Sequence, residues 1–200
     1  PSTSSAASDV YKRQGEMEAE RLFFRGQEYY DNKNVMLKLG CRATAISADK
    51  KTVTLDDQSD LAFSKLIICT GSRPRQLPLP GAELKNIFDV RTIADIDAMK
   101  PAFTPGKKLI IIGGGYIGLE TAAVVCKMGL ETTVIEAADR VLARVTDPVM
   151  SAFYQRVHAE EGVTILTSTG VAGLHGTEGT VSGVELSNGR ILEADCVVVG

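Results

Sequence analysis

The chain has 200 residues, of which 44% are hydrophobic and 24% charged, the composition of a soluble globular protein with one large domain or two small ones. Its formal net charge of −3 argues against a nucleic-acid partner. No apolar run reaches the roughly 18 residues that a transmembrane helix needs, so we expect no membrane partner and a cytoplasmic location.

The N-terminal segment differs in composition from the rest of the chain. Residues 1–14 are rich in serine and alanine and lack the apolar core of a signal peptide, which predicts a foreign or disordered leader. Residues 15–34 have a short helical pattern that ends near Asn34. Its apolar anchors are Leu22, Phe23, Phe24, Tyr29 and Tyr30.

Short strands separated by turn residues come next. They are predicted at residues 35–39, 42–47, 52–55, 61–63 and 65–69. The first three form a small β-meander, which is typical of an insertion between the main strands of a nucleotide-binding domain. Residues 65–69 suit a buried strand that ends abruptly at Thr70 and Gly71.

A stiff connection and a short helix come after these strands. The prolines and the glycine within residues 78–81 predict a turning connection between two domains. Thr92 with Asp95 three residues later is a capping box, so a helix is expected over residues 93–100. Pro101 should end it, because proline cannot continue a helix.

A glycine-rich motif lies between a predicted strand and a predicted helix. Residues 108–112 suit a buried parallel strand and run into Gly113, Gly115 and Gly118, the spacing G-x-G-x-x-G. Gly113 permits a sharp turn, Gly115 leaves room for a pyrophosphate, and Gly118 lets the helix pack closely on the sheet. Unpaired N–H groups and the helix dipole favour the phosphates. The motif predicts a dinucleotide site; the alternative is a glycine-rich turn without a ligand.

An acid ends the second strand of this unit. The helix should end at Gly129, and a strand over residues 132–135 leads into Glu136. Glu136 lies about 20 residues after the glycines, the position of the acid that binds an adenosine ribose. A carboxylate accepts a 2′-hydroxyl and repels a 2′-phosphate, which favours NAD over NADP. Arg140 and Arg144 lie just beyond and leave NADP open.

A second helix begins after this motif. Asp147 and Pro148 are start signals, and the buried face is expected at Val149, Phe153 and Val157.

The end of the chain repeats the plan of the beginning. Strands are predicted at residues 163–166, 171–175, 180–186, 190–192 and 194–199. The middle three form a second β-meander, closed by an Asn188-Gly189 turn, and the last run leads to Gly200. Because meander, buried strand and glycine occur twice, we expect an α/β protein with two related Rossmann-like nucleotide-binding domains, the first incomplete.

The cysteines and histidines predict no metal site. The four cysteines are Cys41, Cys69, Cys126 and Cys196. They form no C-x-x-C pair, and their positions on expected strands or a helix favour buried apolar packing over metal binding. His158 and His175 are too few and too scattered for a cluster, and a surface or partly buried packing position is expected for both.

Four segments together resemble the flavin-dependent pyridine nucleotide oxidoreductases, most closely the single-flavin ferredoxin reductase branch that includes putidaredoxin and rubredoxin reductases. They are Ile67–Arg75, Arg91–Asp95, Ile112–Glu120 and Glu136–Val145. The resemblance covers roughly residues 15–200 and implies an FAD domain interrupted by an NAD domain, then an interface domain. On this basis we expect a partial FAD-binding domain with a linker over residues 15–104 and an NAD-binding Rossmann domain over residues 105–200.

The resemblance also implies contacts to FAD. Thr70 and Gly71 match a turn that approaches FAD, with Cys69 in place of an alanine. Ala43 matches a position facing the adenine end. Arg91 matches an arginine at the flavin nucleotide, and a solvated charge before a helix is the alternative.

Further matches concern NAD. Glu120 matches a carboxylate near the nicotinamide and flavin rings and is the catalytic candidate; an acid favoured by the helix dipole is the alternative. Arg144 looks like a cofactor-contacting arginine, with a surface salt bridge as the alternative. The other expected nucleotide contacts are Gly113, Gly114, Gly115, Tyr116, Ile117, Gly118, Glu136 and Gly200.

The departures from the family pattern limit what these residues should do alone. The first FAD-binding strand-glycine-helix, a loop with a lysine near the flavin, a later segment with an FAD-binding aspartate and the interface domain are not found. We therefore expect residues 1–200 to bind NAD weakly, to hold no FAD and to be inactive by themselves.

The resemblance predicts an enzyme that passes electrons from NADH through FAD to a ferredoxin- or rubredoxin-type iron–sulfur protein. Flavin and nicotinamide would carry the redox chemistry, so no side chain need act as a nucleophile. A monodehydroascorbate reductase or a nitrite reductase flavin module shares these motifs. A redox sensor of the apoptosis-inducing-factor type, in which NAD changes association, is the alternative from another class.

Overall fold

The computed structural model describes residues 25–74 and 76–200. The predicted leader and the anchors Leu22, Phe23 and Phe24 lie outside these residues. Contacts divide the described chain into two units, one that ends at Arg73 and one that begins at Pro74. Each unit is described by itself.

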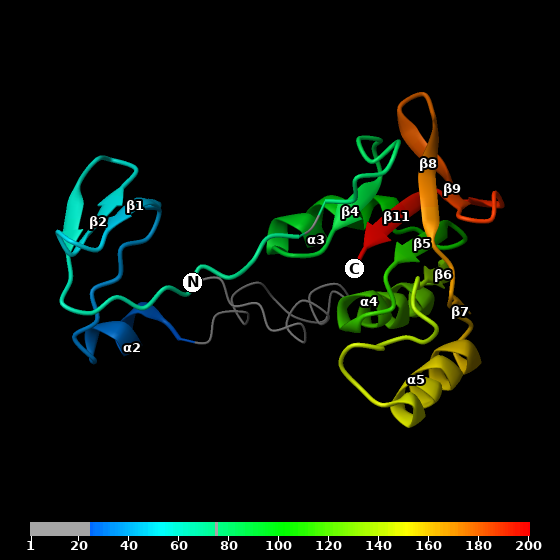
Figure 1. Cartoon of the computed structure of the whole chain (residues 1–200), viewed down its shortest axis with the longest axis horizontal. Helices are drawn as coiled ribbons and strands as arrows, with labels where there is room; N and C mark the ends of the chain where they lie inside the picture. Colours follow the sequence, from blue (N-terminus) through cyan, green and yellow to red (C-terminus); the bar gives the residue numbers. More distant parts are fainter. Residues whose placement is uncertain (1–24, 75) are drawn as a thin grey trace. The chain divides into compact units, whose positions relative to one another are not determined.

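The first unit contains a short helix and a small antiparallel sheet (Figure 1). The helix is α2 (Gln27–Asp31), and the strands are β1 (Ala43–Ser47), β2 (Thr52–Leu55) and β3 (Asp60–Ala62). The sheet order is β1-β2-β3, and Val53 pairs with Ile46 on one side and with Leu61 on the other. The predicted strands 42–47, 52–55 and 61–63 are confirmed to within one residue.

Two predicted strands of this unit are wrong. Residues 35–39 and 65–69 form no strand, and Ile67 and Ile68 have exposed fractions of 85% and 63%. A buried parallel strand is stable only beside a partner that satisfies its backbone groups, and no described strand of this unit pairs with residues 65–69. An apolar run alone therefore did not define a strand.

The second unit is built on a five-stranded parallel sheet (Figure 1). Its strands are β4 (Ile87–Asp89), β5 (Lys108–Ile112), β6 (Glu131–Ile135), β7 (Thr164–Leu166) and β11 (Cys196–Val199). The order is β4-β11-β5-β6-β7. The chain builds outward from β5 to β7 and then returns to the other side of β5. This reversal is the topological switch point at which open α/β sheets bind ligands, and the predicted α/β class is confirmed.

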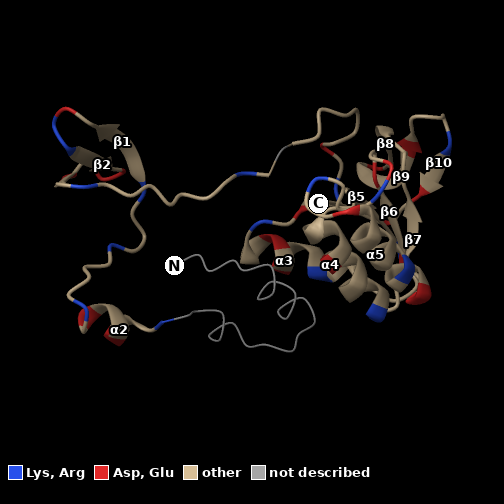
Figure 2. Ribbon diagram, turned by 60° about the horizontal axis from the view of Figure 1, so that its bottom comes forward, with Lys and Arg blue, Asp and Glu red and all other residues tan. Residues whose placement is uncertain are grey.

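Three helices and a short 3₁₀ turn accompany the sheet (Figure 2). They are α3 (Ile93–Met99), η2 (Lys100–Ala102), α4 (Tyr116–Lys127) and α5 (Pro148–Glu160). The predicted capping box of α3 is present, since Thr92 Oγ accepts from the Asp95 N–H and the Asp95 carboxylate accepts from the Thr92 N–H. Gly129, with φ +86°, comes after α4 as predicted.

Alternating residues of the strands face two different layers. Leu109, Ile111 and Val198 pack against the helices, where Met99 and Val125 complete one core cluster. Each fully buried side chain of this kind contributes about 1.5–3 kcal/mol. The cluster contains residues of α3, α4, β5, β6 and β11 and so fixes these helices against the sheet.

The opposite face of the sheet is covered by the second meander. Its strands are β8 (Val171–Thr177), β9 (Thr180–Leu186) and β10 (Ile191–Glu193), in the order β10-β9-β8. Ile110 and Val197 of the parallel sheet pack against Val184 of β9. The predicted meander and its turn are confirmed, and Gly189 has φ +81°.

The predicted buried face of α5 is largely wrong, since only Val157 of its three residues is partly buried. Val149 and Phe153 have exposed fractions of 77% and 47%, whereas Ser151 and His158 are buried. The His158 ring nitrogens lie 2.9 Å from the Tyr154 carbonyl oxygen and 3.1 Å from the carbonyl oxygen of Leu119 on α4. Polar side chains with such partners are buried without a large desolvation cost, and the hydrophobic pattern could not reveal those partners.

The prediction for the cysteines is half right. Cys196 is buried in β11 and Cys126 is partly buried, but Cys41 and Cys69 are exposed. Cys69 ends the apolar run that forms no strand.

None of the helices in the described part of the chain is long and apolar enough to cross a membrane.

Candidate dinucleotide-binding site

The chain turns sharply at the carboxyl end of β5. Gly113 has φ +114°, a conformation that favours glycine, and its N–H donates to the Ile135 carbonyl oxygen at 2.8 Å. A Cβ at this position would lie 2.6 Å from the carbonyl oxygen of Gly200. The predicted tight turn is therefore present, and only glycine fits it.

Gly118 and Gly200 complete a close packing of three backbones. A Cβ on Gly118 would overlap the carbonyl oxygen of Gly113, and one on Gly200 would lie 3.0 Å from the Gly118 nitrogen. Gly200 also donates its N–H to the Ile112 carbonyl oxygen at 2.9 Å. The first turn of α4 can thus approach the ends of β5 and β11 closely.

Gly115 has a different environment from its neighbours. It precedes α4 in an extended conformation, and a Cβ there would meet no described atom within 4 Å. In the described chain no side chain caps this end of α4, and its first turn holds no acid. The first N–H groups of a helix need partners, and an anion satisfies them well. A diphosphate group fits this end of the helix.

Glu136 joins the tip of β6 to the glycine turn. Its Oε2 accepts a hydrogen bond from the Gly114 N–H at 2.7 Å, and its Oε1 accepts one from the Ala138 N–H at 2.8 Å. Each carboxylate oxygen retains capacity for another donor, such as a ribose hydroxyl. A Cβ on Gly114 would lie 2.9 Å from Val141 Cγ1 and 3.1 Å from Glu136 Oε2. The motif leaves position 114 unspecified, so sequence reasoning gave no reason for this glycine.

These elements border a cleft of about 420 Å³. The turn at Gly114 and Gly115 forms one side, and Glu136 with the loop after it forms the other. Tyr116 also lines the cleft. Glu136 and Arg144 are the charged residues of its wall, so the cleft combines backbone N–H groups with one acid and one base.

The other predicted residues of α4 lie nearby. Ile117 in the first turn is exposed and Glu120 in the second is half-buried. Neither lines this cleft.

Arg140, which together with Arg144 leaves NADP open, uses its guanidinium for hydrogen bonds within the loop and to α5. Nη1 donates to the Thr146 carbonyl oxygen at 3.0 Å and to Ser151 Oγ at 2.7 Å, and Nη2 donates to the Ala143 carbonyl oxygen at 3.0 Å. Of the two arginines after Glu136, Arg144 is therefore the one that lines the cleft.

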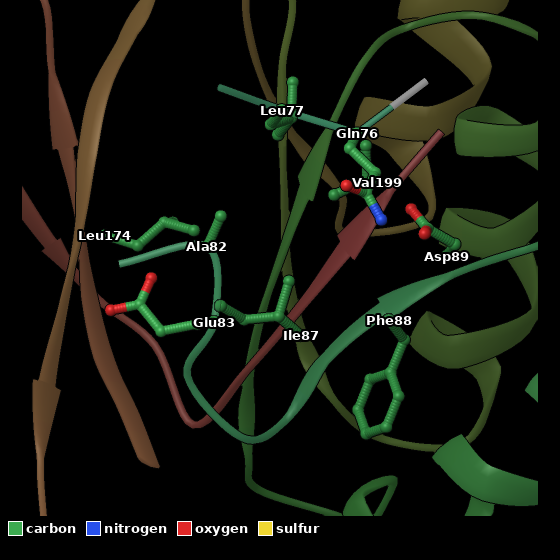
Figure 3. A pocket seen from close by; sticks show the side chains of 9 residues that line it. All are labelled: Gln76, Leu77, Ala82, Glu83, Ile87, Phe88, Asp89, Leu174 and Val199. Carbon is green, nitrogen blue, oxygen red and sulfur yellow. The ribbon is translucent and has the colours of Figure 1, made fainter. Parts of the chain in front are cut away.

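A second hollow, of about 410 Å³, lies at the ends of β4 and β11 (Figure 3). Asp89 and Val199 pair at these strand ends and both line it. Burial, and then the charge of Asp95, raises the pKa of Asp89. Figure 3 shows Asp89 and Glu83 at different ends of the hollow, so the two carboxylates do not form a paired acid site. One hollow therefore lies at the ends of β5 and β6, and the other at the ends of β4 and β11.

The residues predicted to contact FAD are divided between the units. Ala43, Thr70 and Gly71 belong to the first unit and are exposed. Arg91 precedes α3 in the second unit and is half-buried. Their roles stay predictions.

Comparison with known proteins gives the same picture. Residues 3–200 match the family described as pyridine nucleotide-disulphide oxidoreductase. The probable ferredoxin reductase CtmF of Castellaniella defragrans is 40% identical over 185 residues, which are 92% of this chain and 45% of that protein. Putidaredoxin reductase CamA of Pseudomonas putida is 38% identical over 191 residues, 93% of this chain and 45% of that protein.

Solved structures agree. In the covalent putidaredoxin reductase–putidaredoxin complex the matching chain has a TM-score of 0.89 and 36% identity, covering 96% of this chain and 47% of that one. A ferredoxin reductase from Rhodopseudomonas palustris gives 0.90 and 28%, covering 96% and 48%. The chain thus spans somewhat less than half the length of the relatives it matches.

Proposed function

The chain belongs to the pyridine nucleotide-disulphide oxidoreductase family, and from this premise we propose that it forms the NADH-binding part of a flavoprotein reductase. Electrons from NADH pass through FAD to a ferredoxin- or rubredoxin-type iron–sulfur protein. Relatives that are named ferredoxin reductase and putidaredoxin reductase support this assignment. We place the protein in the cytoplasm.

One observation carries the proposal. The uncapped N-terminus of α4 follows the turn at Gly113 and Gly115. It lies beside the Glu136 carboxylate, at the switch point of the parallel sheet. The N–H groups of the α4 terminus can hold the diphosphate, and Glu136 can accept a ribose hydroxyl.

The arrangement favours NADH over NADPH. A 2′-phosphate placed at the adenosine ribose would meet the Glu136 carboxylate, and like charges repel. Arg140 is the nearest arginine after Glu136 in the sequence. Its guanidinium already donates to Thr146, Ala143 and Ser151, so it is not available for a 2′-phosphate. Arg144 remains to contact the shared diphosphate or adenosine.

The other residues have roles that the family resemblance implies. Gly118 and Gly200 keep the backbones close together, Tyr116 and Ile117 contact the nucleotide, and Glu120 lies near the nicotinamide.

FAD belongs to the first unit in this proposal. Gly71 has φ +70° and Thr70 beside it is exposed, so this turn presents an accessible backbone to a nucleotide. The family resemblance implies that Ala43 and Arg91 also contact FAD. The chemistry that FAD supplies when bound is acceptance of a hydride and release of single electrons.

The test uses the full-length protein with NADH and cytochrome c as the final acceptor. We expect rapid cytochrome c reduction only when a ferredoxin is added. Slow NADH oxidation with a change in oligomeric state, unaffected by ferredoxin, would contradict the reductase and support the redox sensor.

A further inference from the structure

We propose that Arg140 is a positioning residue of the nucleotide cleft: it fixes Arg144 and Val145 in the cleft wall and does not bind the nucleotide itself. This inference rests on the proposed function of the cleft.

The hydrogen bonds of Arg140 bracket these two wall residues. Its guanidinium donates to the carbonyl oxygen of Ala143, just before Arg144, and to that of Thr146, just after Val145. Both distances are 3.0 Å. One rigid group therefore fixes the backbone on either side of the segment.

The guanidinium also joins this segment to α5. Nη1 donates to Ser151 Oγ at 2.7 Å, and Ser151 Oγ donates to the Val141 carbonyl oxygen at 2.7 Å. Ser151 has an exposed fraction of 1% and does not line the cleft. A buried hydroxyl with both partners in place is a firm anchor.

The loop needs such an anchor because its backbone is strained. Leu142 has φ +53°, a left-handed conformation that costs a branched residue of this kind stability. Its N–H donates to the Gly114 carbonyl oxygen at 2.9 Å, and the Val145 N–H donates to the Leu142 carbonyl oxygen at 3.0 Å. The strained turn thus links the glycine turn to the wall that Arg140 holds.

The geometry of the three acceptors favours arginine at this position. Two nitrogens of the guanidinium donate to three acceptors, and a lysine ammonium is a single point that cannot reach all of them in the same way. We therefore expect Arg140→Lys to restore little of the function lost in Arg140→Ala.

The experiment measures dissociation constants by calorimetry for NADH, AMP and nicotinamide mononucleotide, on the full-length protein and its variants. Arg140→Ala should raise the dissociation constants of NADH and AMP about tenfold, which corresponds to a loss of about 1.4 kcal/mol of binding free energy. It should leave that of nicotinamide mononucleotide unchanged, because the proposed function places the adenosine half of NADH in this cleft, beside Glu136. Ser151→Ala should raise the NADH value about threefold, since it removes one anchor remote from the cleft.

Two further variants separate positioning from other causes. Arg156→Ala removes an equal charge from α5, where Arg156 pairs with Glu160, and should leave all three dissociation constants unchanged. If Arg140 acts through Arg144, the effects of Arg140→Ala and Arg144→Ala should not add in the double variant.

The possible outcomes are distinct. If the full-length parent protein does not bind NADH, the proposed function fails and the inference fails with it. If the parent binds and Arg140→Ala binds equally well, the inference alone is overturned. A loss in Arg140→Ala that Ser151→Ala does not share, or that is purely additive with Arg144→Ala, indicates direct nucleotide binding and also overturns it. Should Arg140→Ala not fold, Arg140→Lys and Ser151→Ala decide between the same outcomes.

Discussion

The glycines at the end of β5 divide into two kinds by what surrounds them. Gly113 and Gly118 are in contact with backbone atoms that cannot move aside, whereas Gly115 faces open space. The first kind is required for folding and the second is required only if a ligand occupies that space.

Gly118→Ala should therefore destabilise the protein. Its Cβ would overlap the Gly113 carbonyl oxygen, and overpacking of this kind costs about 1–3 kcal/mol. Gly115→Ala is the matched control, because φ −79° suits alanine, and it should change stability by less than about 0.5 kcal/mol. Urea unfolding measures both. Equal losses in the two variants would contradict this division.

The cysteines should differ sharply in reactivity. Burial raises the pKa of the Cys196 thiol to about 12, so its reactive thiolate is scarce at neutral pH. Cys41 and Cys69 are exposed. With a thiol reagent at pH 8, we expect Cys41 and Cys69 to react in the native protein and Cys196 only after unfolding. Mass spectrometry of the labelled peptides identifies the sites, and prompt labelling of Cys196 would refute its burial.

At the scale of elements, Asp195 ties β11 to the start of β5. Its carboxylate accepts from the Lys107 ammonium at 2.8 Å and from the Lys108 N–H at 2.8 Å. The Lys107 hydrogen bond, together with the weaker effect of the Lys108 N–H, lowers the pKa of Asp195. The carboxylate is more than a third exposed, so solvent screening limits its contribution.

Asp195→Asn should lower the free energy of unfolding by about 0.5–1 kcal/mol at pH 7. Because the folded pKa is depressed, the stabilisation is present above the unfolded value of about 3.9 and disappears as the pH falls through the folded value. The two proteins should therefore converge in stability as the pH approaches about 2. Denaturant melts at both pH values test this, and a difference that persists in acid would show that the ion pair is not its source.

Elements with local signals were predictable from the sequence, and those that depend on distant partners were not. The strand, glycines and helix from Lys108 onward, the Thr92 capping box and the turn at Gly189 each carry their own start or stop residue. The buried face of α5 depends instead on partners for Ser151 and His158 that come from a loop and from α4. The amphipathic pattern could not include such contacts.

The apolar run at residues 65–69 failed for a related reason. These residues have the composition of a buried strand. A buried strand also needs a neighbouring strand for its backbone hydrogen bonds, and no strand in the described residues of the first unit pairs with them. In the cleft, the glycines and Glu136 could be predicted from the sequence. The hydrogen bonds of Arg140 could not, because its three acceptors come from residues that are separated in sequence.

At the scale of the whole molecule, the last strand of the second unit completes the middle of its parallel sheet. β11 at the end of the chain lies between β4 and β5, and Gly200 packs on the glycine turn. Figure 2 shows Lys and Arg interspersed with Asp and Glu along both units. The proposed nucleotide site lies at the carboxyl ends of β5, β6 and β11.

The most direct measurement is an NADH titration of the full-length protein and of its Gly115→Val variant by calorimetry. A Cβ at position 115 would enter open space at the start of α4 and meet no described atom within 4 Å. We expect the parent to bind one NADH and the variant to remain folded but lose at least about tenfold in affinity, roughly 1.4 kcal/mol. A folded Gly115→Val variant with unchanged NADH affinity would contradict the assignment of this turn to the diphosphate.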